Sequence, residues 1–515
     1  MSLIRRILGS SLSLLLLVTA LVVGSIFTPN FSVEVGELPS ASSQSAKAAD
    51  LRLVCPGSAY RSGGASGTRL GVFDQVGTAE VNAIVSPKLV ETAGAAVQSV
   101  ALSAQGDSSV LPPASAVPAR IARPTAVTAV DAGGKLDQGS QLLSVSTLQL
   151  QNSKEFSGLL AASCQAPSTD LWFVGGDTSI GREGLLIVTN PSRVDAQIDV
   201  IAFNAGGRVK ADGLTGLSVP AGKTLVLQLA SDLLNQSTLA LHLSATGGSV
   251  AAWLQQRTMR GTIPGGSDFI GPATEVSKSL VIPGLLLRGT ADAAAIIKTR
   301  PEYGDQTPLL RVFVPAMTAT SAANGAGAKA GQTVTVTAQI FGASARTFGT
   351  VLRQELTVGT VTDIPITGLA DGDYVAFVSA ELPVRASIRL PRTNKTKSPA
   401  TDFTWLQAGE SLQGIRGFRV PQSGVTKLSL GNASKSEARL QLGSPAQIIA
   451  GTAPIVTLAA GAVRTIGLTA GALVWMKTES SALRANLVTD LDSTVSSLPI
   501  TDFKNSAEQL LISVR

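Results

Sequence analysis

The sequence contains few of the side chains on which most protein chemistry depends. Among 515 residues there are one histidine and two cysteines, and aromatic residues make up 4%. A catalytic triad or a site with several histidine ligands cannot be built on His242 alone, so a structural histidine is the better interpretation. A metal site on the two cysteines would need further ligands that the sequence does not show. We therefore expect no cofactor, no metal and no enzymatic activity.

Charge is also scarce. Charged residues make up 15% of the chain, and the net charge of +6 is spread over its length without a dense Lys/Arg run. Aromatic residues are not interleaved with the basic ones, so we do not expect nucleic-acid binding.

What the sequence does contain is short aliphatic runs, separated by Gly, Asn and Pro. In residues 196–203, Ile198, Val200 and Ala202 alternate with more polar neighbours, and Asn190-Pro191 supplies a turn before them. Alternation of this kind is typical of antiparallel strands with one buried face. About seven such strands in roughly 100 residues predict an all-β fold of tandem immunoglobulin-like sandwiches. A β-propeller is the alternative, because regular short strands also fit it.

The N-terminus predicts a membrane anchor. Arg5 and Arg6 precede an uncharged segment, residues 7–27, which as a helix would span roughly 32 Å, the thickness of a bilayer core. A cleaved signal peptide is the alternative. We expect an uncleaved single span with a cytoplasmic N-terminus and the bulk of the chain extracellular. The small polar residues that follow predict a flexible tether.

Cys55 and Cys164 bracket the first β region. In an exported chain an even pair of cysteines favours a disulfide over two isolated buried thiols.

Two signals indicate repeated modules. Asn190 precedes Ala196 by the same offset as Asn432 precedes Ala438, within similar alternating runs. A Ser/Thr-Asp-Phe/Leu triplet also recurs, and we interpret each copy as an Asx-type turn at a module junction. The aspartates of the triplets are Asp170, Asp268, Asp402 and Asp502. The predicted organisation is a cytoplasmic stub and anchor (1–28), the tether (29–50) and four β modules (51–169, 170–267, 268–401 and 402–515), the last with a C-terminal strand.

Few other residues suggest a site. The carboxylates of Glu155, Glu183 and Glu381 are scattered, and Asp371 with Asp373 fits a turn better than a cation site. The tryptophans could stack on sugar rings if exposed, although core packing is more common for such residues. These possible glycan-stacking residues are Trp172, Trp253, Trp405 and Trp475.

Several motifs resemble a known family. They are VCPG, AASCQAP followed by DLWFVGG, LLIVTNPSRVDAQIDV, VPAGKTLVLQL and GGSVAAWLQQR. Together with the N-terminal segment they are similar to an actinobacterial family of membrane-anchored extracellular β-rich proteins with no assigned function. The resemblance implies export and carries no site residues. We expect a non-enzymatic scaffold or interaction protein of the cell envelope, with another envelope protein as partner. A cell-wall glycan-binding array is the alternative, and an exported hydrolase is a third hypothesis.

Overall fold

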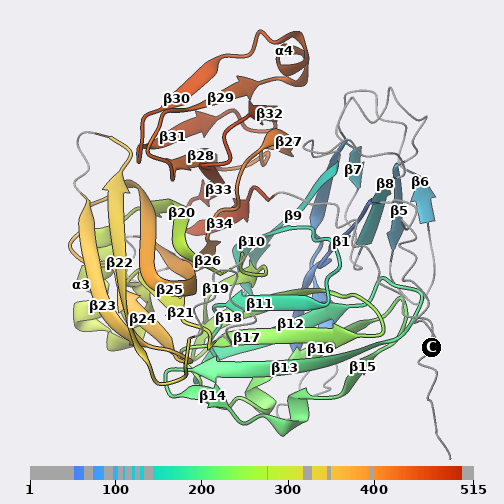
Figure 1. Cartoon of the computed structure of the whole chain (residues 1–515). Coiled ribbons are helices and arrows are strands. Elements are labelled where there is room, and N and C mark those ends of the chain that lie inside the picture. The colour runs from blue at the N-terminus through green and yellow to red at the C-terminus, as the bar shows by residue number, and fades with distance from the viewer. Residues whose placement is uncertain are drawn as a thin grey trace, which may run out of the picture. The chain divides into compact units, whose positions relative to one another are not determined.

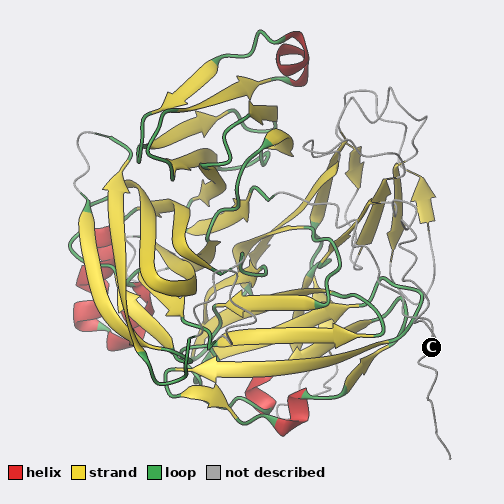
Figure 2. Cartoon of the chain, in the orientation of Figure 1, coloured by secondary structure: helices red, strands yellow, loops and turns green. Residues whose placement is uncertain are grey.

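Strands dominate the computed structural model (Figures 1 and 2), which confirms the predicted all-β class. It describes residues 51–62, 73–85, 97–101, 108–110, 119–121, 128–132, 143–274, 276–316, 328–344, 349–394 and 400–501. The predicted anchor and tether, Asp502 and Phe503 of the fourth triplet, and the C-terminal strand lie outside these residues. No helix within the described ranges is both long and apolar enough to cross a membrane.

Four successive stretches of the chain each form antiparallel sheets, and we call them groups 1 to 4. Group 1 holds β1 (Leu51–Cys55), β2 (Ala59–Ser62), β3 (Phe73–Val76), β4 (Glu80–Val85), β5 (Val97–Ala101), β6 (Ser108–Val110), β7 (Ala119–Ile121), β8 (Thr128–Ala132), β9 (Leu143–Asn152) and β10 (Ser157–Ser163). Group 2 holds β11 (Asp170–Val174), β12 (Arg182–Thr189), β13 (Ala196–Asn204), β14 (Gly207–Val209), η1 (Asp212–Leu214), β15 (Leu217–Val219), β16 (Thr224–Gln228), η2 (Leu229–Ser231), β17 (Ala240–Thr246), β18 (Ala251–Arg260) and β19 (Ile263–Ile270).

Groups 3 and 4 complete the described chain. Group 3 holds β20 (Ser277–Leu287), α3 (Thr290–Thr299), η3 (Pro301–Gln306), β21 (Leu309–Phe313), β22 (Thr333–Gly342), β23 (Thr350–Thr357), β24 (Val361–Pro365), β25 (Gly372–Thr393) and β26 (Thr401–Gln407). Group 4 holds β27 (Gly414–Arg419), β28 (Val425–Asn432), β29 (Ala438–Gly443), α4 (Pro445–Ala450), β30 (Ile455–Leu458), β31 (Val463–Leu468), β32 (Leu473–Thr478), β33 (Leu483–Leu491) and β34 (Thr494–Pro499).

All four groups repeat one strand order. In each, one sheet ends in the last strand of the group: β7-β4-β9-β10, β16-β12-β18-β19, β24-β21-β25-β26 and β31-β28-β33-β34. The other sheet begins with the first strand: β1-β8-β5-β6, β11-β17-β13-β14, β20-β25-β22-β23 and β27-β32-β29-β30. In group 3 the long β25 runs through both sheets, where the other groups use two separate strands.

This order differs from that of an immunoglobulin domain, so the finer prediction of immunoglobulin-like modules is not confirmed. In that fold the third, sixth and seventh strands share one sheet. Here β13 pairs with β17, but β18 joins β12 in the opposite sheet. The β-propeller alternative is not confirmed either, because a propeller blade is a single sheet, whereas groups 2 and 4 each form two separate sheets. Alternation predicts strands reliably but does not determine which strands pair.

The predicted similarity between Asn190 and Asn432 has a matching geometry. Each amide nitrogen donates at 2.8 Å to the carbonyl four residues later and bonds a second carbonyl, on β15 or β30. Each amide oxygen accepts the N–H of the serine two residues later. Because both side chains satisfy the same turn, the two groups are built alike at this point.

The predicted disulfide between Cys55 and Cys164 is confirmed. The residue after it, Gln165, exchanges two backbone hydrogen bonds of 2.8 Å with Val54. The two hydrogen bonds and the disulfide together fix the end of group 1 against β1.

The last strands of the four groups meet. We call β10, β19, β26 and β34 the junction strands; each contacts the next, and β34 contacts β10. Their labels lie close together in Figure 1. Side chains of these strands enter neighbouring cores: Phe403 and Trp405 of β26 pack in the core of group 2, and Val495 of β34 packs in that of group 3. The groups are therefore not a row of independent modules.

Candidate functional site

Hydrogen bonds connect the junction strands in a closed cycle. Ser267 on β19 donates through Oγ to the carbonyl of Ser157 on β10 at 2.7 Å, and Ser163 on β10 donates to Pro499 at the end of β34 at 3.0 Å. The hydroxyls of Thr404 on β26 and Ser497 on β34 lie 3.0 Å apart. The cycle closes between β26 and β19 through two buried carboxylates.

Asp402 is the centre of this network. Its Oδ2 accepts the backbone N–H groups of Leu159 at 2.9 Å and Val495 at 3.1 Å, and its Oδ1 accepts that of Ser267 at 3.1 Å. The donors belong to groups 1, 4 and 2. One fully buried side chain of group 3 thus satisfies a backbone donor in each of the other groups.

Asp268 lies on β19 and faces β26. Its Oδ2 accepts the N–H of Trp405 at 2.7 Å and the hydroxyl of Thr404 at 3.2 Å. Its Oδ1 is buried with no hydrogen-bond partner among the described residues. Burial raises the pKa of Asp268 well above its ordinary value, and the nearby charge of Asp402 adds to this. Burial also raises the pKa of Asp402, to about 7, against the opposing effect of its backbone donors.

The sequence predicts an Asx-type turn at each triplet, and for the second and third triplets this prediction is wrong. Asp268 and Asp402 lie inside strands, and their donors come from distant groups rather than from the next residues. The predicted module boundaries at 267/268 and 401/402 fall inside β19 and β26. Asp170 is different again: its side chain is 63% exposed and lies 2.6 Å from His242. A shared triplet thus occupies two different structural positions.

Two glycines allow the close approach around Asp402. Gly158 has φ +138°, and a Cβ there would lie 2.5 Å from Oγ of Ser267. Gly266 has φ +106°, and a Cβ there would lie 2.5 Å from Oδ1 of Asp402. Both the backbone conformation and the space require glycine.

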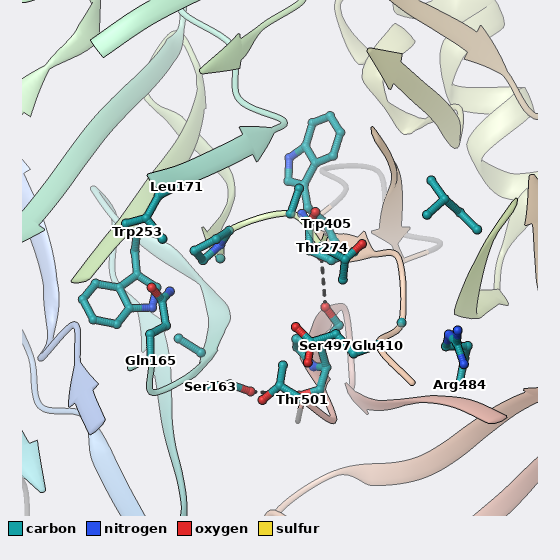
Figure 3. A pocket seen from close by; sticks show the side chains of 18 of the residues that line it. Ser163, Gln165, Leu171, Trp253, Thr274, Trp405, Glu410, Arg484, Ser497 and Thr501 are labelled. Carbon is teal, nitrogen blue, oxygen red and sulfur yellow. Dashed lines mark hydrogen bonds between the residues drawn. The ribbon is translucent and has the colours of Figure 1, made fainter. Parts of the chain in front are cut away.

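A pocket of about 570 Å³, which we call the junction pocket, lies beside this network (Figure 3). Its walls include residues from all four junction strands, and the loops after β19 and β26 complete it. Apolar wall is supplied by Leu171, Phe269 and Leu280, and hydroxyls by Ser163, Thr274, Ser277, Ser279 and Ser411. The volume is in the range of pockets that enclose small ligands.

Two glutamines in the pocket wall have unsatisfied side chains. Neither the oxygen nor the nitrogen of the Gln165 and Gln407 amides has a hydrogen-bond partner among the described residues. The backbone of Gln165 is fixed by Val54, and that of Gln407 pairs with Ser387 on β25. Gln407 is only 4% exposed. Backbone pairing thus holds both glutamines in the pocket wall with their amides buried and unpaired, and no local sequence pattern indicated this.

The charge of the described lining residues is balanced. Among them only Glu410 and Arg484 are ionisable as acid or base. Burial lowers the pKa of Arg484, and the charge of Glu410 opposes that shift. Figure 3 places Arg484 on the side of the view opposite Gln165 and Trp253.

The tryptophans do not form the glycan-stacking platforms considered above. Trp253, Trp405 and Trp475 are at most 3% exposed, because each lies in a strand whose neighbours cover it. Trp172 is half-buried, but its ring already stacks on His242 with centroids 4.0 Å apart, and Arg385 lies over it at 5.0 Å. Two of the buried rings, Trp253 and Trp405, do contribute to the pocket wall.

The other acidic candidates have local partners. Asp371 accepts the N–H groups of Gly289 and Thr290 at the start of α3, and Asp373 forms an ion pair with Lys427 at 2.8 Å. The glutamates lie in separate places: Glu155 pairs with Arg61, Glu183 with Arg257, and Glu381 accepts the N–H of Thr335. Nothing in these contacts brings two carboxylates to the pocket.

Sequence reasoning missed a buried charge cluster around Asp305 on η3. Arg182 and Arg260 from group 2 and Arg389 from group 3 all contact its carboxylate, and their side chains are 5–13% exposed. Burial raises the pKa of Asp305, but Arg389, Arg260 and Arg182 outweigh it and hold the pKa below its ordinary value. The cluster attaches η3 to two groups. The three arginines are far apart in the sequence, so no local pattern could have revealed it.

Comparison with known proteins identifies a family to which this chain belongs. The search of curated proteins found no match. A family described as "Family of unknown function (DUF5719)" matches residues 119–466, which include groups 2 and 3 and parts of groups 1 and 4. The match covers more than half of the sequence, so the chain belongs to this family of unknown function.

Proposed function

We propose that the protein is a non-enzymatic, membrane-anchored interaction protein of the cell envelope, and that the junction pocket is its binding site. One observation carries the proposal: a pocket of about 570 Å³ is walled by all four groups and has, among its described lining residues, a single carboxylate. A glycosidase site needs two carboxylates, and a triad needs a base beside its nucleophile. The described wall is equipped to bind rather than to react.

The envelope location rests on the sequence. An apolar segment at residues 7–27 after two arginines favours a membrane span with the rest of the chain outside. The disulfide between Cys55 and Cys164 fits an oxidising compartment. The resemblance to actinobacterial membrane-anchored proteins supports the same location.

A mutation at the pocket mouth tests the proposal. Ser279 lines the pocket and is exposed, so Ser279→Trp would fill the mouth without entering a core. Ser218→Trp, at an exposed position on β15, is the matched control. The full chain, in a detergent without a sugar headgroup, is mixed with labelled soluble fragments and extracted proteins of the envelope.

We expect the unchanged protein and Ser218→Trp to retain an envelope component that Ser279→Trp does not retain. Retention that is equal in all three proteins would place binding elsewhere and reject the pocket. Turnover of a wall fragment by the unchanged protein would reject the non-enzymatic assignment.

A further inference from the structure

We infer that the loops at one end of group 2 form a membrane-contact surface, which inserts exposed aliphatic side chains into a lipid bilayer. We call this surface the loop end. It consists of residues 175–181, 229–239 and 261–263, none of which lines the junction pocket. The inference therefore goes beyond the proposed function and does not depend on the pocket.

Strand pairing brings these loops to the same end of group 2. Val174 at the end of β11 pairs with Ala240 at the start of β17. Arg182 at the start of β12 pairs with Thr258 near the end of β18, which leads into β19 through residues 261–262. Because paired antiparallel strands begin and end side by side, all three loops lie beyond one edge of the two sheets, in the lower part of Figure 1.

Each loop carries one large exposed aliphatic side chain. Ile180 is 96% exposed, Leu234 75% and Ile263 42%. A single exposed aliphatic residue is common on a protein surface, but several on adjoining loops indicate a contact surface. The tips of the loops, residues 178–181, 234–237 and 261–263, contain no charged residue. They can therefore leave water without desolvating a charge.

Backbone hydrogen bonds join the three loops. The N–H of Thr178 donates to the carbonyl of Gln236 at 2.8 Å, which connects the first loop to the second. The N–H of Met259 donates to the carbonyl of Gly181 at 2.7 Å, which connects the first loop to the end of β18. The exposed residues thus belong to one connected surface.

Group 3 also holds the loop end in place. Arg311 donates to the carbonyls of Gly176 at 2.6 Å and Ser237 at 2.8 Å, one on each of two loops. Asn235, next to Leu234, has φ 56°, a conformation that few residues other than glycine adopt. Because the loops are fixed in advance, a contact that buries their side chains costs little ordering.

The fold does not require these loops. Group 4 has the same strand order, yet only residues 469–472 connect β31 and β32, where residues 229–239 connect β16 and β17 in group 2. The turn between β33 and β34 is Asp492-Ser493, where group 2 has Gly261-Thr262. Both sheets therefore form without a long loop that carries an exposed leucine.

The side chains at the tips fit a bilayer better than a protein partner. The residues that contribute most to protein interfaces are enriched in Trp, Tyr and Arg, and leucine is under-represented among them. The three tips contain none of those enriched types. Aliphatic side chains can enter the outer part of a bilayer by about 5–10 Å without a complementary pocket.

A membrane is also within reach of the loop end. Arg52, near the start of the described chain, donates to the carbonyl of Pro191 at 2.7 Å, at the opposite end of group 2. The eight residues of β12 separate the two ends by about 26 Å. The predicted tether, residues 29–50, can extend up to about 75 Å. The predicted anchor and the loop end can therefore contact the same bilayer.

Tryptophan fluorescence of the full chain in liposomes of phosphatidylcholine and phosphatidylglycerol tests the inference. Ile180→Trp places a reporter in the loop end. Val194→Trp is the matched control, because Val194 is 55% exposed in the turn at the opposite end of group 2. The lipids are either ordinary or brominated near the start of the acyl chains, so only a tryptophan that enters the bilayer is quenched. The unchanged protein gives the background of its four tryptophans.

After subtraction of this background, the fluorescence of Ile180→Trp should be at least about twofold lower in brominated than in ordinary lipid. That of Val194→Trp should be the same in both. Adding Leu234→Ser and Ile263→Ser to Ile180→Trp should remove most of the quenching, because less apolar surface is buried. The quenching should persist in about 1 M salt, since an apolar contact is not screened.

Equal fluorescence of Ile180→Trp in the two lipids would overturn the inference. Equal quenching of Ile180→Trp and Val194→Trp would also overturn it, because it would show adsorption without a preferred surface. If Ile180→Trp were not quenched but Leu234→Ser reduced capture of an envelope protein, the loop end would be a protein interface and the inference would be wrong. The effect of Ser279→Trp is measured separately, so these outcomes leave the test of the junction pocket unchanged.

Discussion

Asp402 accepts a hydrogen bond of 2.9 Å from the backbone N–H of Leu159, a residue 243 positions earlier in the chain. The same oxygen also accepts from Val495, so one carboxylate connects groups 1, 3 and 4. Asp402→Ala leaves three buried N–H groups without an acceptor. We predict a loss of at least about 3 kcal/mol in the free energy of unfolding, measured by urea denaturation.

Asp170→Ala is the matched control, because this aspartate belongs to the same sequence triplet but is 63% exposed. In this variant the free energy of unfolding should fall by less than about 1 kcal/mol. Equal losses for the two variants would show that the junction carboxylate has no special structural role.

The space around Asp402 gives a second prediction. Gly266→Ala places a Cβ 2.5 Å from Oδ1 of Asp402, whereas Gly207→Ala, at the same φ of +106°, meets no atom closer than 3.7 Å. Both variants carry the same backbone strain, so their difference reports the clash. Gly266→Ala should be less stable than Gly207→Ala by about 1–3 kcal/mol in thermal or urea unfolding. A difference near zero would mean that the strands separate easily at this point.

The junction carboxylates also predict an unusual pH dependence. Burial raises the pKa of Asp402 to about 7, above the value near 4 of an unfolded aspartate. The native state then binds more protons than the unfolded state between about pH 4 and 7. Stability should therefore fall as the pH rises through this window, by up to about 1.4 kcal/mol per pH unit for one group. The raised pKa of Asp268 acts in the same direction.

Urea unfolding at pH 5, 6, 7 and 8 measures this slope. Asp402→Asn, which cannot ionise, should reduce it, whatever its effect on absolute stability. A stability that rises steadily from pH 5 to 8 would contradict the raised pKa values.

The charge cluster at η3 gives a fourth prediction. Asp305→Asn removes the one carboxylate shared by Arg182, Arg260 and Arg389, and leaves their charges buried without compensation. Unfolding free energy should fall by about 3–5 kcal/mol. Asp212→Asn, which loses an exposed pair with Lys210, should change it by at most about 1 kcal/mol. Similar values for both would indicate that water already screens the cluster.

Sequence patterns predicted the local structure well. The alternation of Ile198, Val200 and Ala202 predicted a strand, and these three residues are buried in it together with Ala196. The pairing of Cys55 with Cys164 followed from the number of cysteines and the expected compartment. The predicted similarity of Asn190 and Asn432 has a structural basis, because each asparagine side chain makes the same hydrogen bonds within its own turn. The strand and the turn depend on neighbours in sequence, whereas the disulfide could be predicted because the chain has only two cysteines.

Features that depend on distant residues could not be predicted. The donors of Asp402 come from three other groups, and the buried amides of Gln165 and Gln407 become neighbours of one pocket only when those groups meet. The burial of Trp253 could have been predicted from the sequence. Residues 251–254 form an unbroken apolar run, as expected for a strand buried on both faces.

The most direct test of the account is hydrogen–deuterium exchange of the full chain, alone and saturated with the envelope component that it captures. We predict slower exchange in residues 161–166, 271–274, 407 and 409–411, which line the junction pocket, with little change on the exposed outer strands β14 and β23. Protection confined to regions away from these segments would contradict the assignment of the pocket as the binding site.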